Sequence, residues 1–261
     1  MPPHNIILLV FVFLIAAVLV VPVGSSDTSY YFHSGKALSE GKNPYAEKWV
    51  LKKDFVYPAA SEEIVGFSYG PIIAALFKLN YRITHGNLVW FILAWKIFMF
   101  VSLVVFVDIT YQLARAVAGP IHKRNFFIAF ALHPIFIFEW LTNGHFDVLW
   151  MIAVVGAILA AHYKKWWIVI PALAIGVWIK FIPAIISPLF VLWWWQSITR
   201  DNAKRQLAET LVGVLLSALV TIAAWYPYWR GSIVFHALVI QTKLASVSLF
   251  AALYYSLKQL F

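Results

Sequence analysis

The sequence contains no cysteine and few charged residues. The lack of cysteine excludes disulfide frameworks, thiolate metal sites and cysteine nucleophiles. Asp, Glu, Lys and Arg make up 12% of the 261 residues, against about 25% in an ordinary soluble domain. Apolar residues reach 62%. This composition indicates a membrane protein and excludes an aqueous domain of any size.

Apolar stretches predict seven membrane-spanning helices, and therefore an all-α integral membrane protein with one membrane domain over residues 1–261. The predicted spans are Ile6–Val23, Leu88–Val107, Phe126–Trp140, Val148–Tyr163, Trp166–Ile179, Phe181–Trp195 and Leu207–Tyr226. The segment Ser232–Phe261 mixes apolar and polar residues, so it either lies at the membrane interface or forms part of an eighth span.

The 20 Lys and Arg outnumber the 11 Asp and Glu, and the excess falls in three loops. These loops follow the second, fourth and sixth spans and contain Arg115, Lys123, Arg124, Lys164, Lys165, Arg200, Lys204 and Arg205. With a cytoplasmic N-terminus all three loops lie on the inner face, as the positive-inside rule requires. The basic charge therefore indicates membrane topology and gives no reason to expect a nucleic-acid partner.

The connection from Gly24 to Asn87 is long and lies on the outer face in this topology. The segment Ser25–Asp27 offers helix-capping side chains for a first helix, which ends before Gly41, and Pro71 starts a second helix. Both helices carry apolar beside polar residues, which predicts elements lying on the membrane surface. Loops of this length are usually functional.

Polar residues on the outer face have two interpretations each. Asp27 is either a helix N-cap or a carboxylate that accepts a proton from a hydroxyl. Asp147 either caps the fourth span or belongs to a site, and His145 is either solvated or functional. Glu139 and Asn143 lie in the same short stretch, and capping explains only one of these four polar residues.

Cations have two interpretations as well. Lys180, between two apolar runs, either extends its amine to lipid headgroups or binds a phosphate at the outer mouth of the helix bundle. Arg230 is a weaker candidate for the same phosphate. Lys96 lies near the middle of the second span, where a charge costs on the order of 3 kcal/mol, so it requires a partner inside the bundle. Asp108 is too far along the helix to be that partner.

The candidate residues come from four separate loops that the topology places on one face: Asp27, His145, Asp147, Lys180 and Arg230. An acid, an imidazole and cations beside a bilayer suit chemistry on a lipid-linked phosphate, because a carboxylate can act as base while cations stabilise the departing phosphate oxygens.

Several motifs, in this order, carry a family resemblance: Ser26-Asp27, Gly41-Lys42-Asn43-Pro44-Tyr45, Phe67-Ser68-Tyr69-Gly70-Pro71, Leu132-His133-Pro134, Asn143-Gly144-His145-Phe146-Asp147 and Lys180-Phe181-Ile182-Pro183. Over about residues 6 to 230 the chain resembles the GT-C superfamily of polyprenol-phosphate-sugar glycosyltransferases. It is most similar to the mannosyltransferases that use polyprenol-phosphate-mannose.

The resemblance implies a GT-C-like fold and transfer of a hexose, with mannose favoured, from a polyprenyl monophosphate to a lipid or glycan acceptor with inversion. It implies that Asp27 is the catalytic base and that Lys180, with Arg230, binds the donor phosphate. Sugar or acceptor contacts are expected from His145, Asp147, Asn143 and Tyr69. Many members have a second acidic residue beside the first, whereas Ser26 and Thr28 flank Asp27 here. No cofactor is therefore certain, and a divalent metal stays open.

Two alternatives to an enzyme remain. A small transporter or lipid flippase predicts polar residues near mid-bilayer, and only Lys96 fits that pattern. A non-catalytic subunit of a membrane complex predicts no turnover by the purified chain. The sequence has no Asn-x-Ser/Thr site, which favours a multi-pass protein of the plasma membrane, with its site on the outer face, over one of the endoplasmic reticulum.

Overall fold

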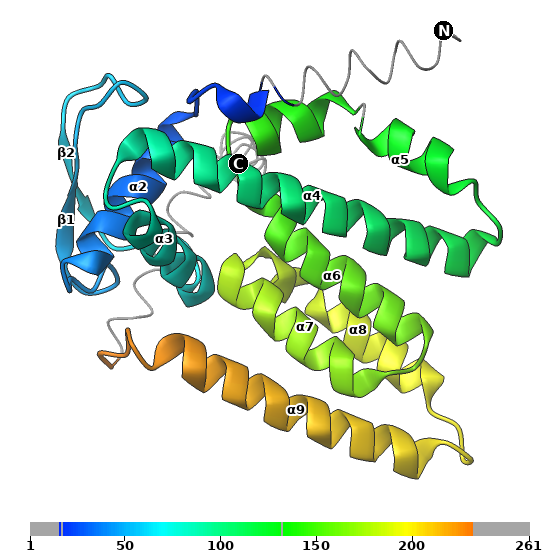
Figure 1. Cartoon of the computed structure of the whole chain (residues 1–261). Helices are drawn as coiled ribbons and strands as arrows, with labels where there is room; N and C mark the ends of the chain where they lie inside the picture. Colours follow the sequence, from blue (N-terminus) through cyan, green and yellow to red (C-terminus); the bar gives the residue numbers. More distant parts are fainter. Residues whose placement is uncertain (1–15, 17, 132, 232–261) are drawn as a thin grey trace, which may run out of the picture.

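The computed structural model describes residues 16, 18–131 and 133–231. The described chain is mostly helical (Figure 1). Its helices are α2 (Ser26–Ser39), α3 (Pro71–Ile83), α4 (Leu88–Ala118), α5 (Lys123–Ala131), the π-helix η1 (Phe136–Thr142), α6 (Asp147–His162), α7 (Trp166–Ile179), α8 (Ile182–Ser197) and α9 (Ala203–Trp225). Most of the predicted first span, and the segment Ser232–Phe261, lie outside the described residues.

Within the described residues, α4 and α9 are long and apolar enough to cross a membrane. The pair η1 and α6, bent by 119°, counts as a third crossing if it forms one broken span, and α7 is a shorter apolar helix. These helices confirm a helical membrane protein. The number of seven spans stays a prediction.

Helix α4 continues well beyond the predicted end at Val107. Asp108 accepts hydrogen bonds from Gln112 Nε2 at 2.7 Å and Lys123 Nζ at 3.2 Å. The polar side chains that follow Val107 thus bond to one another on the surface of the helix. The helix ends at Gly119, whose φ of 84° suits glycine. The hydropathy therefore falls before the backbone leaves the helix, and the end of the span at Val107 stays a prediction.

The predicted third span is divided into two elements, α5 and η1. The break comes at His133, directly before Pro134. A residue before proline is disfavoured in the helical conformation, and proline itself removes a hydrogen-bond donor. The prediction of one continuous helix from Phe126 to Trp140 was therefore wrong.

The outer connection differs from the all-α prediction, because it contains an antiparallel hairpin of β1 (Lys48–Leu51) and β2 (Glu62–Val65). Trp49 and Leu51 on β1 are buried and share a small apolar cluster with Ala37 of α2. Helix α2 lies against α3, α4 and this hairpin (Figure 1), and its buried residues, which include Thr28, Ser29 and the run 31–35, do not form a single stripe. It is therefore a core helix and has more than the one dry face that was expected, while its place at the membrane surface stays a prediction.

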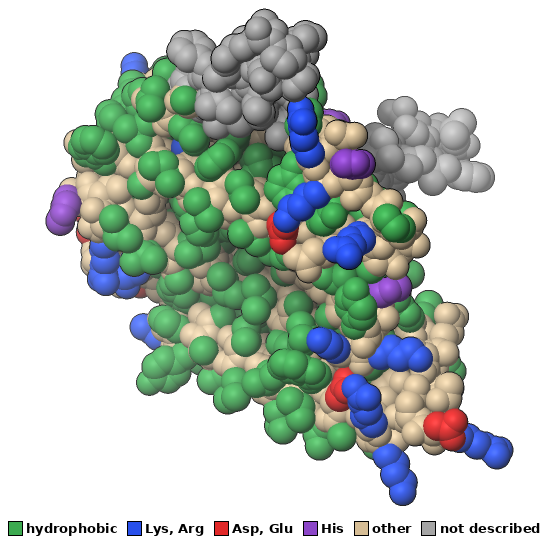
Figure 2. All heavy atoms as spheres, turned by 45° about the vertical axis from the view of Figure 1, so that its right-hand side comes forward, with side chains coloured by type: hydrophobic (Ala, Val, Ile, Leu, Met, Phe, Trp, Pro, Cys, Tyr) green, Lys and Arg blue, Asp and Glu red, His purple; other side chains and the backbone are tan. Residues whose placement is uncertain are grey.

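The basic loops gather at one end of the helices. The α4–α5, α6–α7 and α8–α9 connections lie together, away from α2, α3 and the hairpin (Figure 1). Figure 2 shows Lys and Arg side chains collected on this part of the surface and hydrophobic side chains over much of the rest. On α9 the exposed side chains include an apolar stripe that suits contact with lipid: Leu207, Leu211, Leu215, Leu219 and Ile222.

Candidate active site

The start of α2 is tied to the segment between η1 and α6. Ser25 Oγ and Thr28 Oγ1 both donate to the carbonyl oxygen of Asn143, each at 2.9 Å. Ser25 is the N-cap residue, yet its side chain makes no capping bond to its own helix. The hydroxyls that resemble caps in the sequence therefore join two distant polar segments.

Asp27 is the second residue of α2, so the N-cap interpretation of this residue was wrong. Its side chain is 41% exposed, and Oδ2 lies 3.5 Å from Nε2 of His145. The same His145 nitrogen lies 3.8 Å from Oε2 of Glu139. Glu139 lies in η1, and π-helical turns are frequent at functional sites. The arrangement is an accessible carboxylate beside an imidazole and a second carboxylate.

Asp147 is held by two donors. Its Oδ1 accepts from Lys180 Nζ and from Trp150 Nε1, both at 2.6 Å. Asp147 is the first residue of α6 and makes no capping bond, so the capping interpretation was wrong here too. The Lys180 ammonium also lies 5.7 Å from the ring centre of Phe146. Lys180 is therefore bound to its neighbours and does not simply extend toward headgroups.

Tyr69 packs beside the second of these groups. Its ring lies edge-on to Phe146, with the ring centres 4.8 Å apart. Burial raises the pKa of Tyr69 well above its usual value, and the charges of Asp27 and then Asp147 raise it further. The phenol therefore stays protonated and able to donate a hydrogen bond.

Gly70 brings this loop against the end of α7. Its N–H donates to the carbonyl of Ile179 at 3.1 Å, and a Cβ at this position would lie 1.9 Å from the carbonyl oxygen of Trp178. Only glycine permits this approach, which joins the loop after Tyr69 to the end of α7 directly before Lys180. The Tyr45 hydroxyl donates to the Tyr69 carbonyl at 2.9 Å, so the two outer-loop motifs support each other.

Arg230 is not brought to these residues. It is exposed, and Nη1 donates to the carbonyl of its neighbour Trp229 at 2.9 Å. Among the residues that the structure describes, no contact links Arg230 to Lys180. The segment before it is nevertheless fixed, because Asn43 Nδ2 donates to the Tyr228 carbonyl at 2.8 Å.

Lys96 has found partners that the sequence could not indicate. Its Nζ donates to the carbonyl oxygens of Val21 at 2.8 Å and Val18 at 3.0 Å. In the 31-residue α4, Lys96 lies in the third turn, and its place near the middle of the predicted span Leu88–Val107 stays a prediction. Asp108 pairs with Lys123 instead, as its distance from Lys96 along the helix predicted.

Four contributors were missed or underrated by the sequence: Thr28, Glu139, Trp150 and Trp95, whose Nε1 donates to the Gly144 carbonyl at 2.8 Å. The density of polar residues in 139–147 was the available signal for Glu139. Nothing in the sequence distinguishes Trp95 and Trp150 from the other tryptophans. In the described part of the chain, no three His, Asp or Glu side chains form a group that could hold a metal ion.

A family model described as alpha-(1->6)-mannopyranosyltransferase, N-terminal domain, of the MptA/B family, matches residues 2–197. No curated protein and no solved structure matches the chain. The matched range contains Asp27, Tyr69, His145, Asp147 and Lys180, and it stops before Arg230. The chain belongs to the MptA/B family of mannosyltransferases.

Proposed function

We propose that the chain transfers mannose from a polyprenyl monophosphate to a hydroxyl of a lipid or glycan acceptor, with inversion at the anomeric carbon. One observation carries this proposal above the others. An accessible carboxylate, Asp27, lies 3.5 Å from His145. A phosphate-binding candidate, Lys180, binds Asp147 at 2.6 Å, two residues farther along the same segment. Base and cation are the two groups that this reaction needs.

In the proposed reaction, Asp27 accepts the proton of the acceptor hydroxyl. The acceptor oxygen forms a bond to the anomeric carbon as the bond from that carbon to the phosphate oxygen breaks, and polyprenyl phosphate leaves with the bonding electrons. Lys180 stabilises the charge that develops on this oxygen. His145 orients the Asp27 carboxylate, and Tyr69, Asn143 and Asp147 contact sugar or acceptor hydroxyls.

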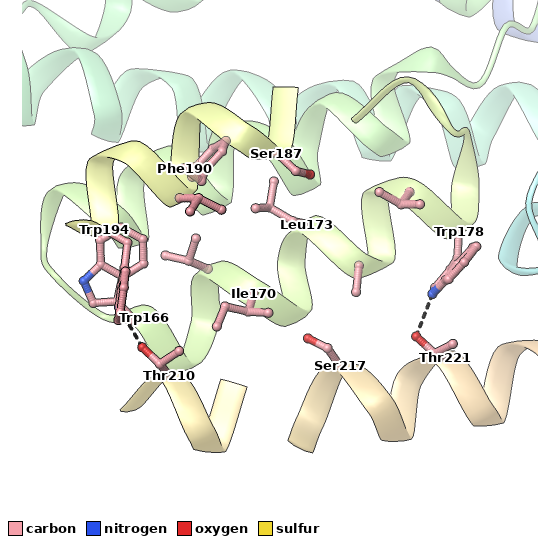
Figure 3. A pocket seen from close by; sticks show the side chains of 14 residues that line it. Trp166, Ile170, Leu173, Trp178, Ser187, Phe190, Trp194, Thr210, Ser217 and Thr221 are labelled. Carbon is pink, nitrogen blue, oxygen red and sulfur yellow. Dashed lines mark hydrogen bonds between the residues drawn. The ribbon is translucent and has the colours of Figure 1, made fainter. Parts of the chain in front are cut away.

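A cavity of about 530 Å³ between α7, α8 and α9 offers a place for the polyprenyl chain. Its walls are almost wholly apolar along α7, from Trp166 to Trp178 (Figure 3). Two indole N–H groups, of Trp194 and Trp178, lie at its two ends and donate to Thr210 and Thr221 (Figure 3). Trp178 lies two residues before Lys180, and in the proposal the phosphate leaves the cavity at this end and reaches Lys180.

The membrane orientation completes the proposal. We place the basic loops in the cytoplasm and the site at the outer face of the plasma membrane, in a multi-pass arrangement. The transporter alternative loses its main support, because Lys96 binds the carbonyls of Val18 and Val21 and does not face a substrate path.

The test is a transfer assay with the purified chain in lipid nanodiscs. Polyprenyl phosphate mannose, labelled in the sugar, should yield a mannosylated acceptor and free polyprenyl phosphate, and NMR of the product should show the opposite anomeric configuration. Nucleotide-linked mannose, tested in parallel, should give no product. Transfer from the nucleotide donor alone, or retention of configuration, would contradict the proposal.

A further inference from the structure

Two adjacent residues in the third turn of α4 hold different parts of the site. Trp95 and Lys96 are 1% and 2% exposed. Trp95 donates to the Gly144 carbonyl, which lies between Asn143 and His145. Lys96 donates to the carbonyls of Val18 and Val21, which precede Asp27. One turn of α4 therefore contacts both the chain that leads into α2 and the polar segment before α6.

The contact made by Lys96 suits a helix end. Residues 18–20 are helical and the chain bends at Val21. The last carbonyls of a helix have no donor within the helix and carry partial negative charge, so an ammonium can bind them without a carboxylate. Val21 also accepts from the N–H of Val23. Within the described chain, no acidic side chain forms an ion pair with Lys96.

The free-energy cost of placing a charged side chain at position 96 indicates that Lys96 has a specific role. A charged side chain within a membrane span costs on the order of 3 kcal/mol, and here two backbone carbonyls meet the charge. The ammonium fixes the backbone at Val21, where the chain leaves the short helical stretch 18–20. Only residues 22–24 separate this fixed point from Ser25, which is bonded to Asn143.

We infer that Lys96 is a positioning residue for Asp27: it fixes the chain at Val21 while Ser25 and Thr28 fix it at Asn143, and Asp27 lies on the segment so held. The inference rests on the proposed function, because it takes Asp27 as the base. Since a base displaced by about 1 Å can cost on the order of 10²-fold in rate, loss of one anchor should be visible in kcat.

The first arm of the test measures turnover by Lys96→Met. Methionine has a similar length and no charge, so the helix should insert and fold well. We expect kcat to fall by about 10²-fold while KM for the donor changes less than about two-fold, because Lys180 and the apolar cavity are untouched. Lys96→Arg, which keeps donors and charge, should recover part of kcat. The matched control is Ser102→Ala, buried on the same helix and bonded only to its own helix at the Phe98 carbonyl, and it should keep kcat.

The second arm does not depend on activity. Because the chain has no cysteine, Ser25→Cys gives a single labelling site, with Thr28 left to hold Asn143. Its reaction with an impermeant maleimide should be several-fold faster when Lys96 is methionine, while a cysteine at exposed Ser61 should react equally in both backgrounds.

Unchanged labelling together with normal kcat in folded Lys96→Met would overturn the inference. If Lys96→Met does not fold, Lys96→Gln is measured in the same way, and full activity there would overturn it as well. If Lys96→Met labels faster but the parent chain itself shows no mannosyl transfer, the anchor at Val21 is supported and the proposed function is contradicted. The two failures are therefore distinguishable.

Discussion

Helix α2 takes part in two histidine–aspartate pairs with different surroundings. At its start, Asp27 lies 3.5 Å from His145, and the two side chains are 41% and 30% exposed. Farther along, His33 lies 3.3 Å from Asp54, and these side chains are 7% and 13% exposed. The same residue types thus occur once in an open position and once in a closed one.

The partners of the two carboxylates differ as much as their exposure. Asp54 also accepts from Ser29 Oγ at 2.5 Å and from the N–H groups of Val56 and Tyr57 at 2.7 Å. Its bonds are directed inward and fasten the β1–β2 connection to α2. Asp27 has one loose contact to His145 and an open side. A closed pair stabilises a fold, whereas an open pair can meet a substrate.

The largest expected effect separates the two pairs by activity. Asp27→Asn keeps the shape of the side chain and removes the proton acceptor, so kcat for mannosyl transfer should fall by about 10²-fold or more with the melting temperature nearly unchanged. Asp54→Asn is the matched control, and its folded fraction should retain normal kcat. Near-normal turnover by folded Asp27→Asn would rule out its role as base.

The next largest effect concerns Lys180. Lys180→Gln removes the charge, so kcat/KM for the donor should fall by about 10- to 150-fold, the equivalent of about 1.5–3 kcal/mol for a hydrogen bond to a charged group. Lys180→Arg should retain part of the activity. The KM for the acceptor should change less than the KM for the donor. If the Gln variant consumes donor normally, the phosphate binds elsewhere, and Arg230 is the next residue to test.

A smaller effect is expected at the closed pair. Asp54→Asn leaves several buried donors with a weaker acceptor, so the free energy of unfolding should fall by about 1–3 kcal/mol. Thermal unfolding in detergent, followed by intrinsic fluorescence, measures this change. A stability equal to that of the wild type would show that the β1–β2 connection is held by other contacts.

The smallest effect is a pH dependence of stability. Burial lowers the pKa of His33, and its contacts with Asp54 only partly oppose this. The unfolded state therefore binds the proton more readily, near the ordinary His value of about 6.5. Stability should be full above that pH and decline as the pH falls toward the lowered folded pKa, by less than about 1.4 kcal/mol per unit. His33→Gln should flatten the decline, and an equally steep profile would assign it to other groups.

The sequence predicts the helices best where long apolar runs end at polar residues. Helix α7 has the predicted bounds, Trp166–Ile179, and α6 differs from its prediction by one residue at each end. The strands β1 and β2 were not predicted because four residues carry too little periodicity. The burial of α2 was not predicted because it depends on three elements that cover a helix with low intrinsic hydropathy.

The sequence predicts which residues belong to the candidate site better than it predicts their contacts. The order of the motifs and the positive-inside topology predict that Asp27, His145, Asp147 and Lys180 lie near one another, and the structure places them in two adjoining groups. Which residue contacts which was not predictable. Asp147 binds Lys180 across 33 positions, and Lys96 binds backbone carbonyls, whose availability leaves no mark in the sequence.

The central claim is that the donor phosphate binds at Lys180, with its chain along α7. Cryo-electron microscopy of the protein with polyprenyl phosphate in nanodiscs tests this most directly. We expect phosphate density within hydrogen-bonding distance of Lys180 Nζ and chain density in the cavity between α7, α8 and α9. Phosphate density at the opposite end of the helices, among the basic loops, would contradict it.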